Sequence, residues 1–169
     1  MCIRDRKDSF RDFYGFDDEK CEQAVKYYRE YYTTKGIFEN RVYDGVEECL
    51  KKLSEAGLHL AVATSKPQVF AVKILEHFHL AQYFDYIGGA ELDGSRSVKA
   101  DVIVHTLKNC GVNDRSQVIM AGDRYHDVLG AKALGIDCIG MLYGYGTREE
   151  LSQAGAAVSY THLTLPTIC

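Results

Sequence analysis

The sequence predicts an α/β fold, a doubly wound parallel sheet, accompanied by a separate helical segment. From about residue 41 onward, short and continuously apolar runs alternate with amphipathic helical patterns. This alternation is typical of parallel strands that are covered by helices on both faces. Residues 7–40 instead contain helical patterns and no strand-like run, which indicates a helical insert beside the sheet.

The insert carries a dense group of tyrosines at helical spacing, namely Tyr27, Tyr28, Tyr31 and Tyr32. Side chains three and four positions apart are neighbours on a helix surface, so these rings are expected to form one aromatic patch. The patch fits either packing between helices or a lid whose phenolic hydroxyls face a ligand. The sequence leaves both interpretations open.

The sheet region begins with a helix expected over 46–57, where apolar side chains recur at helical spacing until Gly57 ends the helix. Pro67 suits the first turn of the next helix, because the N–H that it lacks would have no partner there. Thr147 and Glu150 have the spacing of a capping box, which marks the start of the last helix. Further helices are expected after Pro67 and over 98–111, 126–135 and 147–155.

Four apolar runs predict the strands, and their expected ranges are 58–64, 84–89, 117–122 and 136–144. The carboxyl ends of parallel strands meet at one edge of a sheet, and such sheets bind ligands at that edge. Thr64, Gly88 and Asp123 are expected there. The glycine-rich stretches GGAELDG and YGYGT are expected to form turns.

Both ends of the chain are expected to be encoded by a sequencing adapter, and such segments are set aside in fold reasoning. The DNA string ATGTGTATAAGAGACAG encodes residues 1–5 and begins the codon of Arg6, and its reverse complement encodes residues 158–162. It resembles the adapter that transposase-based sequencing libraries attach to both ends of a fragment. The expected organisation is adapter at 1–6, part of a helical cap at 7–40, an incomplete α/β core at 41–157 and adapter at 158–169.

Charge and composition argue against several classes of protein. The chain has 20 Lys and Arg and 24 Asp and Glu, a formal net charge of −4. Residues 1–6 contribute +1 and residues 158–169 contribute none, so residues 7–157 carry −5, unlike a basic nucleic-acid-binding domain. No apolar run approaches the ~18 residues of a membrane span. Isolated cysteines outside C-x-x-C pairs are typical of core residues in a reducing cytoplasm, and four fit this description, Cys21, Cys49, Cys110 and Cys138.

Asp123 and Asp127 follow an apolar strand at the point where a helix begins, in the stretch VIMAGDRYHDVLGAKALGI. Oxygen ligands at such a position suit Mg²⁺, which typically takes one or two protein carboxylates together with water and substrate phosphate. The alternative is that Asp123 caps the following helix. His126, which lies between the two acids, has no evident second ligand and is expected to be exposed.

Two further features are expected at the same edge of the sheet. Thr64 and Ser65 end the first strand, and a hydroxyl with free amides at a helix N-terminus forms an anion cradle; the alternative is again a helix cap. Lys99 lies at or just before the start of a helix, where a cation is unfavourable to the helix dipole. It fits either a phosphate-binding role or a solvated surface lysine.

The order of these features resembles the haloacid dehalogenase superfamily, and is closest to its phosphoglycolate phosphatase-like branch, whose helical cap is inserted after the first strand. ATSKP resembles the second motif of that superfamily, Lys99 in SRSVKADVI resembles the third, and GDRYHD resembles the fourth. The resemblance implies that Thr64 and Ser65 bind phosphate, that Asp123 and Asp127 hold Mg²⁺, and that Lys99 and Asp127 serve catalysis.

The chain departs from the superfamily at the first motif, an apolar strand followed by D-x-D-x-T, which the sequence does not contain. The first Asp of that motif supplies the nucleophile that forms an aspartyl-phosphate, and such covalent catalysis requires its carboxylate. The resemblance therefore implies a Mg²⁺-dependent phosphatase as the parent protein and an inactive fragment in this chain. A sheet without its first strand is also expected to expose strand edges.

The implied substrate is a small phosphorylated metabolite such as phosphoglycolate or a nucleotide, in a cytoplasmic protein without nucleic-acid or membrane partners. Two alternatives stay open. One is a phosphosugar mutase or another phosphotransferase of the same fold, and the other is a non-catalytic doubly wound binding module. The sequence does not indicate the oligomeric state.

Overall fold

The protein is seen in a computed structural model that describes residues 6–93 and 95–160. The helical insert consists of α1 (Arg6–Tyr14), α2 (Asp18–Tyr31) and a π-helical turn η2 (Tyr32–Gly36). α1 packs against α2, and Cys21 between them is fully buried. Asp17 begins α2 because its carboxylate accepts a hydrogen bond from the backbone N–H of Lys20.

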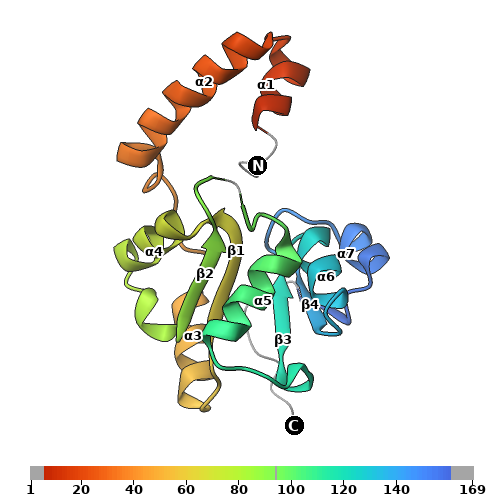
Figure 1. Cartoon of the computed structure of the whole chain (residues 1–169). Helices are drawn as coiled ribbons and strands as arrows, with labels where there is room; N and C mark the ends of the chain where they lie inside the picture. The colour runs from red at the N-terminus through yellow and green to blue at the C-terminus, as the bar shows by residue number, and fades with distance from the viewer. Residues whose placement is uncertain (1–5, 94, 161–169) are drawn as a thin grey trace.

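Strands and helices then alternate, as the sequence predicts. Figure 1 shows the strands pointing the same way, with their carboxyl ends toward α1 and α2. The helices are α3 (Val46–Glu55), α4 (Gln68–His77), α5 (Lys99–Asn109), α6 (Tyr125–Lys132) and α7 (Arg148–Ala154), with short 3₁₀ turns η3 (Ala81–Tyr83) and η4 (Arg115–Gln117). The strands are β1 (Ala61–Pro67), β2 (Tyr86–Ala90), β3 (Ile119–Gly122), β4 (Asp137–Met141) and β5 (Val158–Tyr160).

All strand pairs are parallel, which confirms the predicted α/β class, but the strands form two sheets. One has the order β1-β2 and the other the order β3-β4-β5. The edge of β1 opposite β2 and the edge of β3 opposite β4 therefore have no strand partner within residues 6–93 and 95–160. On β3 the side chain of Ile119 is 66% exposed, although an apolar parallel strand is normally covered on both faces.

Helices connect the two sheets. α5 packs on β1 and β2, α6 packs on β3 and β4, and α5 and α6 contact each other. The largest group of buried apolar side chains lies on the α6 side of this contact. Its members are Ile103, Val128, Ala131, Ile136, Cys138, Leu151 and Ala154.

The first strand differs from the prediction, because it spans Ala61–Pro67 instead of 58–64. The backbone N–H of Leu58 bonds to the carbonyl of Leu53 and so closes the end of α3. The N–H of Leu60 bonds to the carboxylate of Asp85. These groups are thus used outside the strand ladder. At its other end β1 continues to Pro67, with a shift in register after Thr64.

The two glycines of GGAELDG are buried within β2, in agreement with the strand predicted over 84–89, and the turn expected for this stretch lies after them, at Leu92 and Asp93. A Cβ on Gly88 would lie 2.0 Å from Oγ1 of Thr106, and a Cβ on Gly89 would lie 2.6 Å from the backbone of Gln68. The glycines are therefore required for close packing of α5 and α4 on β2. YGYGT does form an irregular turn after β4.

The described residues overlap the predicted adapter segments only at residue 6 and at residues 158–160. Val158–Tyr160 forms β5, which pairs with β4, while residues 1–5 and 161–169 lie outside the described residues. The adapter assignment, and the division into a cap at 7–40 and a core at 41–157, stay predictions. None of the helices in the described ranges has the length and hydropathy that a bilayer-spanning segment needs.

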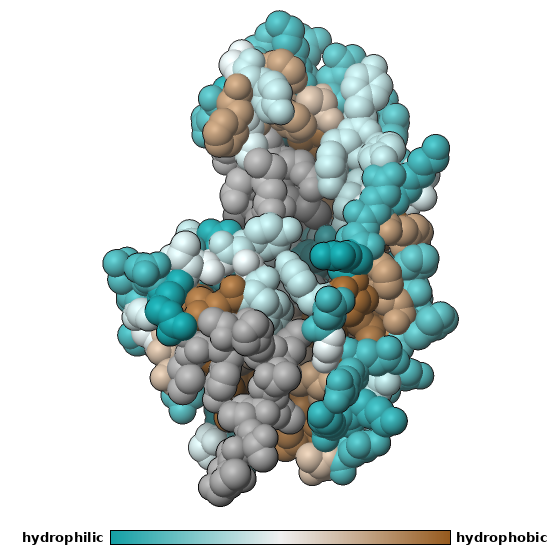
Figure 2. All heavy atoms as spheres, turned by 180° about the vertical axis from the view of Figure 1, so that it is seen from behind, coloured by the Kyte–Doolittle hydropathy of each residue, from teal (hydrophilic) through white to brown (hydrophobic). Residues whose placement is uncertain are grey.

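The surface of the α/β part is mixed. Viewed from behind, Figure 2 shows patches of hydrophobic side chains among mainly hydrophilic ones. Leu58, Ile119 and Leu129 are about half exposed or more. Such exposed apolar side chains are consistent with two sheets whose edge strands, β1 and β3, each lack a strand partner on one side in the described chain.

Substitution of Leu151 tests how much the packing between α6 and α7 contributes to the free energy of unfolding. It is fully buried in the cluster between α6 and α7, so Leu151→Ala should lower the free energy of unfolding by about 2–5 kcal/mol. Leu129→Ala is the matched control, because Leu129 on α6 is 48% exposed and should cost less than about 1 kcal/mol. Urea unfolding measures both, and equal losses would contradict this packing.

Candidate active site

Lys99 is the first residue of α5, after Val98, and its ammonium lies between the two sheets. Its Nζ atom lies 2.7 Å from Oδ1 of Asp127 and donates a hydrogen bond of 2.8 Å to the carbonyl oxygen of Ala63 on β1. The two charged side chains are only 12% and 11% exposed. The interpretation of Lys99 as a solvated surface lysine was therefore wrong, because its charge is paired in the interior.

Asp127 also caps its own helix. Its Oδ2 atom accepts a hydrogen bond of 3.1 Å from the backbone N–H of Arg124 at the start of α6. Gly122 makes this approach possible, because a Cβ at that position would lie 2.2 Å from Cβ of Asp127. The same carboxylate thus stabilises the beginning of α6 and holds the ammonium of Lys99.

Asp123 lies directly after β3, but it is not the cap of α6, which is Arg124. Its Oδ2 atom accepts a hydrogen bond of 2.8 Å from the backbone N–H of Tyr145. A Cβ on Gly144 would lie 2.3 Å from that carboxylate, so the turn after β4 closes on Asp123 only because this residue is glycine. The Oδ1 atom has no hydrogen-bond partner among the described residues.

Thr64 and Ser65 lie in β1 directly after Ala63, the residue whose carbonyl binds Lys99. Oγ1 of Thr64 accepts a hydrogen bond of 3.2 Å from the backbone N–H of Lys66. The side chain of Ser65 makes no hydrogen bond within the described part of the chain. Thr64 and Ser65 are therefore the next two residues after Ala63, whose carbonyl binds Lys99.

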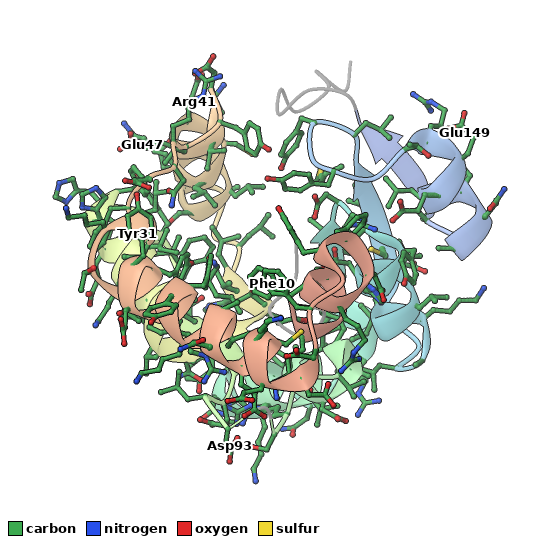
Figure 3. The ribbon with its side chains drawn as sticks, turned by 90° about the horizontal axis from the view of Figure 1, so that it is seen from above. Phe10, Tyr31, Arg41, Glu47, Asp93 and Glu149 are labelled. Carbon is green, nitrogen blue, oxygen red and sulfur yellow. The ribbon has the colours of Figure 1, made fainter. Side chains whose placement is uncertain are left out.

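The predicted residues converge only in part. Lys99 and Asp127 are in direct contact, and Lys99 also binds the carbonyl of Ala63 in β1, the residue before Thr64. Within the described ranges no hydrogen bond joins Thr64 or Ser65 to either aspartate. Seen from above, α1 and α2 lie across this end of the α/β part, as Figure 3 shows with Phe10 on α1 and Tyr31 on α2.

The two carboxylates fit a divalent cation that prefers oxygen ligands. Gly122 and Gly144 leave space for Asp127 and Asp123 that a Cβ would fill. In residues 6–93 and 95–160, no group of three or more His, Cys, Asp or Glu side chains is arranged to hold a metal. A pair of carboxylates is nevertheless a sufficient protein contribution for Mg²⁺, which keeps several waters and binds substrate phosphate.

Glu150 contacts the segment that follows Asp123, although its spacing from Thr147 indicated only a capping box. The first half of that box is confirmed, since Oγ1 of Thr147 accepts from the N–H of Glu150 at 3.1 Å. The carboxylate of Glu150, however, accepts from Nε of Arg124 at 2.8 Å and from the N–H of Tyr125 at 2.9 Å. It therefore connects α7 to the segment that follows Asp123. No sequence pattern indicates this long-range contact.

The electrostatics of this segment follow from the same contacts. The hydrogen bond from Arg124 lowers the pKa of the Glu150 carboxyl, and the hydrogen bond from Tyr125 N–H adds to this effect. Burial, with a smaller contribution from the carboxylate of Asp127, raises the pKa of the Cys138 thiol to about 11. Cys138 is therefore a neutral core residue at physiological pH, as the sequence predicts. His126 is exposed, also as predicted.

A family model described as haloacid dehalogenase-like hydrolase matches residues 5–141. The chain belongs to this family. The haloacid dehalogenase-like chain is 46% identical over 142 residues to a 5'-nucleotidase of Pseudomonas aeruginosa, covering 84% of this chain and 64% of the relative. It is 32% identical over 147 residues to a phosphoglycolate phosphatase of Pseudomonas savastanoi, covering 87% of this chain and 53% of the relative.

Two further similarities bear on the family's chemistry. A tyrosine-protein kinase PtkA of Mycobacterium tuberculosis is 41% identical over 140 residues, covering 83% of this chain and 48% of the relative. A solved structure described as a putative phosphatase from Clostridium difficile is 49% identical, with a TM-score of 0.88 over 91% of this chain and 72% of that one. The chain thus spans about half to two thirds of the length of its curated relatives. The predicted superfamily is confirmed.

The ion pair between Lys99 and Asp127 should be strongly coupled. Lys99→Met leaves a buried carboxylate without its cation and should lower the free energy of unfolding by about 3 kcal/mol. The variant carrying both Lys99→Met and Asp127→Asn should recover part of that loss. Urea unfolding of the four chains in a double-mutant cycle gives the coupling energy.

The exposed pair of Lys52 and Glu48 is the control for this cycle. Its side chains are 58% and 70% exposed, so water screens the pair and its coupling energy should be much smaller than that of the Lys99 pair. Similar coupling energies for the two pairs would contradict the buried position of the Lys99 pair.

The contact of Glu150 predicts a dependence of stability on pH. Because its pKa is lowered in the folded state, its contribution is present above the ordinary value of 4.5 and is lost as the pH falls through the folded pKa. The difference in urea midpoint between wild type and Glu150→Gln should therefore be largest near pH 7 and shrink below pH 4.5. Glu76→Gln, at an exposed position of α4, is the matched control. A difference for Glu150→Gln that stays constant with pH would refute the assignment.

Proposed function

We propose that this chain is part of a Mg²⁺-dependent phosphomonoester hydrolase that acts on a small phosphorylated metabolite through an aspartyl-phosphate. The observation that supports it most is the buried Lys99, which contacts Asp127 after β3 and the carbonyl of Ala63 in β1. The ammonium thus binds the residue that directly precedes Thr64 and one of the two carboxylates that fit a divalent cation. Phosphoryl transfer depends on such positioning and charge stabilisation.

Each residue has a distinct part in the proposal. Thr64 and Ser65 donate hydrogen bonds to the phosphate oxygens, and Lys99 offsets their charge. Asp123 would hold Mg²⁺ directly through Oδ1, the carboxylate oxygen that does not accept from the N–H of Tyr145. Asp127 orients the ammonium of Lys99 through their ion pair. When bound, Mg²⁺ would neutralise charge on the phosphate and bring it toward a carboxylate nucleophile.

The nucleophile itself belongs to residues outside this chain. The 169 residues contain no apolar strand followed by D-x-D-x-T, and the curated relatives are longer than this chain. The facing edges of β1 and β3, which lack strand partners among the described residues, support a further parallel strand between the two sheets. A carboxylate at the end of that strand would lie near Lys99, and the 169-residue chain would release no phosphate by itself.

The names of the relatives support a small phosphorylated substrate, because one is a 5'-nucleotidase and another a phosphoglycolate phosphatase. The relative named a tyrosine-protein kinase favours a second candidate, a phosphotransferase in which an acceptor other than water takes the phosphoryl group. A non-catalytic binding module is less well supported, because Asp123 does not act as the cap of α6. A cytoplasmic location is also proposed, in line with free thiols at Cys21, Cys49, Cys110 and Cys138.

Activity of the longer protein, recovered from the source DNA upstream of this reading frame, tests the proposal. It should release phosphate from phosphomonoesters only with Mg²⁺, and Asp123→Asn should lower kcat by at least about 10²-fold because the cation loses a direct ligand. Asp137→Asn is the matched control, since Asp137 is exposed at the start of β4, and it should keep full activity.

Product analysis separates the two candidates. Free phosphate as the product supports the hydrolase, whereas a phosphorylated acceptor supports the phosphotransferase. Phosphate release that survives removal of Mg²⁺ by EDTA, or that survives Asp123→Asn, would contradict the proposed site.

A further inference from the structure

Lys66 is a second lysine near the candidate phosphate site, and it lies on the side that faces the helical insert. It is two residues after Thr64 in β1, and its backbone N–H donates to Oγ1 of Thr64 at 3.2 Å. Pro67, which follows it, is buried and precedes α4. The backbone of Lys66 is thus fixed from both sides.

The side chain of Lys66 reaches the insert. Its Nζ atom donates to the phenolic oxygen of Tyr32 at 2.5 Å and lies 5.1 Å from the centre of the same ring. Tyr32 in turn stacks on Tyr28 at 5.4 Å and meets the edge of Phe70 on α4 at 5.7 Å. These contacts hold the ammonium between β1 and the end of α2.

The backbone at Tyr32 is unusual, because a π-helical turn, η2, begins there. π-helical turns within α-helices occur frequently at functional sites, since they redirect the side chains of the turn. Of the tyrosine patch, Tyr27 and Tyr31 are 61% and 50% exposed, whereas Tyr28 and Tyr32 are half-buried. The hydroxyl of Tyr32 is directed at Lys66, which lies near the end of β1, before α4.

The charge of Lys66 is not balanced within residues 6–93 and 95–160. Lys99 has Asp127 within 2.7 Å, but no described carboxylate forms an ion pair with Lys66. A half-buried ammonium that contacts a phenol hydroxyl binds anions more strongly than one exposed to water. This charge lies between the phosphate-binding residues and the insert.

We propose that Lys66 is a specificity-determining residue that binds a second anionic group, a carboxylate or a phosphate, on the part of the substrate that is not transferred. This inference rests on the proposed function. Thr64, Ser65 and Lys99 face the transferred phosphate from the core, so the remaining part of the substrate extends toward α2. Tyr32 holds the ammonium in place there, which reduces the entropy lost when the anion binds.

Binding of two matched compounds to the 169-residue chain tests this inference by calorimetry. Ethyl phosphate and 2-phosphoglycolate differ by a methyl group in place of a carboxylate. The chain should bind 2-phosphoglycolate about tenfold more tightly, the effect of one charge-assisted hydrogen bond. Ethane-1,2-diol bisphosphate shows whether a phosphate serves as well as a carboxylate, and equal or tighter binding identifies a second phosphate as the preferred group.

Lys66→Met should abolish the preference for the second anion and leave the affinity for ethyl phosphate within about twofold. Lys73→Met is the matched control, because Lys73 is an exposed lysine of α4, and it should keep the preference. Thermal unfolding of both variants verifies that the chain is folded.

The outcomes separate this inference from the proposed function. Equal affinities of wild type for ethyl phosphate and for both compounds with a second anionic group, or a preference that survives Lys66→Met, would overturn the role of Lys66 while the phosphate site stands. Loss of ethyl phosphate binding in Lys99→Met reports on the proposed function alone. Failure of wild type to bind any of the compounds would overturn both.

Discussion

The position of one buried ammonium determines most of the geometry described above. Lys99 begins α5, a place that its own helix dipole disfavours, and it is held there by Asp127 and by the carbonyl of Ala63. Asp127 belongs to the β3–α6 side and Ala63 to the β1–β2 side, so the lysine connects two sheets that share no strand pairing in the described chain. Removing its charge would leave the buried carboxylate of Asp127 without its cation, which is strongly destabilising.

Two glycines allow close backbone approach to Asp127 and Asp123. Gly122 allows Asp127 to fold back on the start of α6, and Gly144 allows the turn after β4 to close on Asp123. Glu150 then fastens α7 to the residue that follows Asp123. The aspartates are thus held from several elements, which is the rigidity that a site for a small anion requires. Lys66 and Tyr32 extend the same polar region toward the helical insert.

Much of this arrangement could be predicted from sequence. The alternation of apolar runs and helical patterns identified the α/β class, and the spacing of Thr64, Lys99, Asp123 and Asp127 indicated the family that the comparisons confirm. Their functional roles stay predictions. Local patterns did not reveal contacts between distant residues, such as the carboxylate of Glu150 on Arg124, which lies 26 positions away. They also extended the turn expected at GGAELDG over Gly88 and Gly89, although these glycines lie in β2 and allow α5 and α4 to pack closely on that strand.

The central claim is that Thr64, Lys99 and Asp123 form one site for phosphate and Mg²⁺. A crystal structure of the longer protein with Mg²⁺ and inorganic phosphate tests it most directly. Phosphate oxygens should lie within hydrogen-bond distance of Oγ1 of Thr64 and Nζ of Lys99, and the cation should lie on the carboxylate of Asp123. Phosphate bound elsewhere, with Lys99 still contacting only Asp127 and Ala63, would show that the ion pair is a structural link between the sheets and that these residues do not form one site.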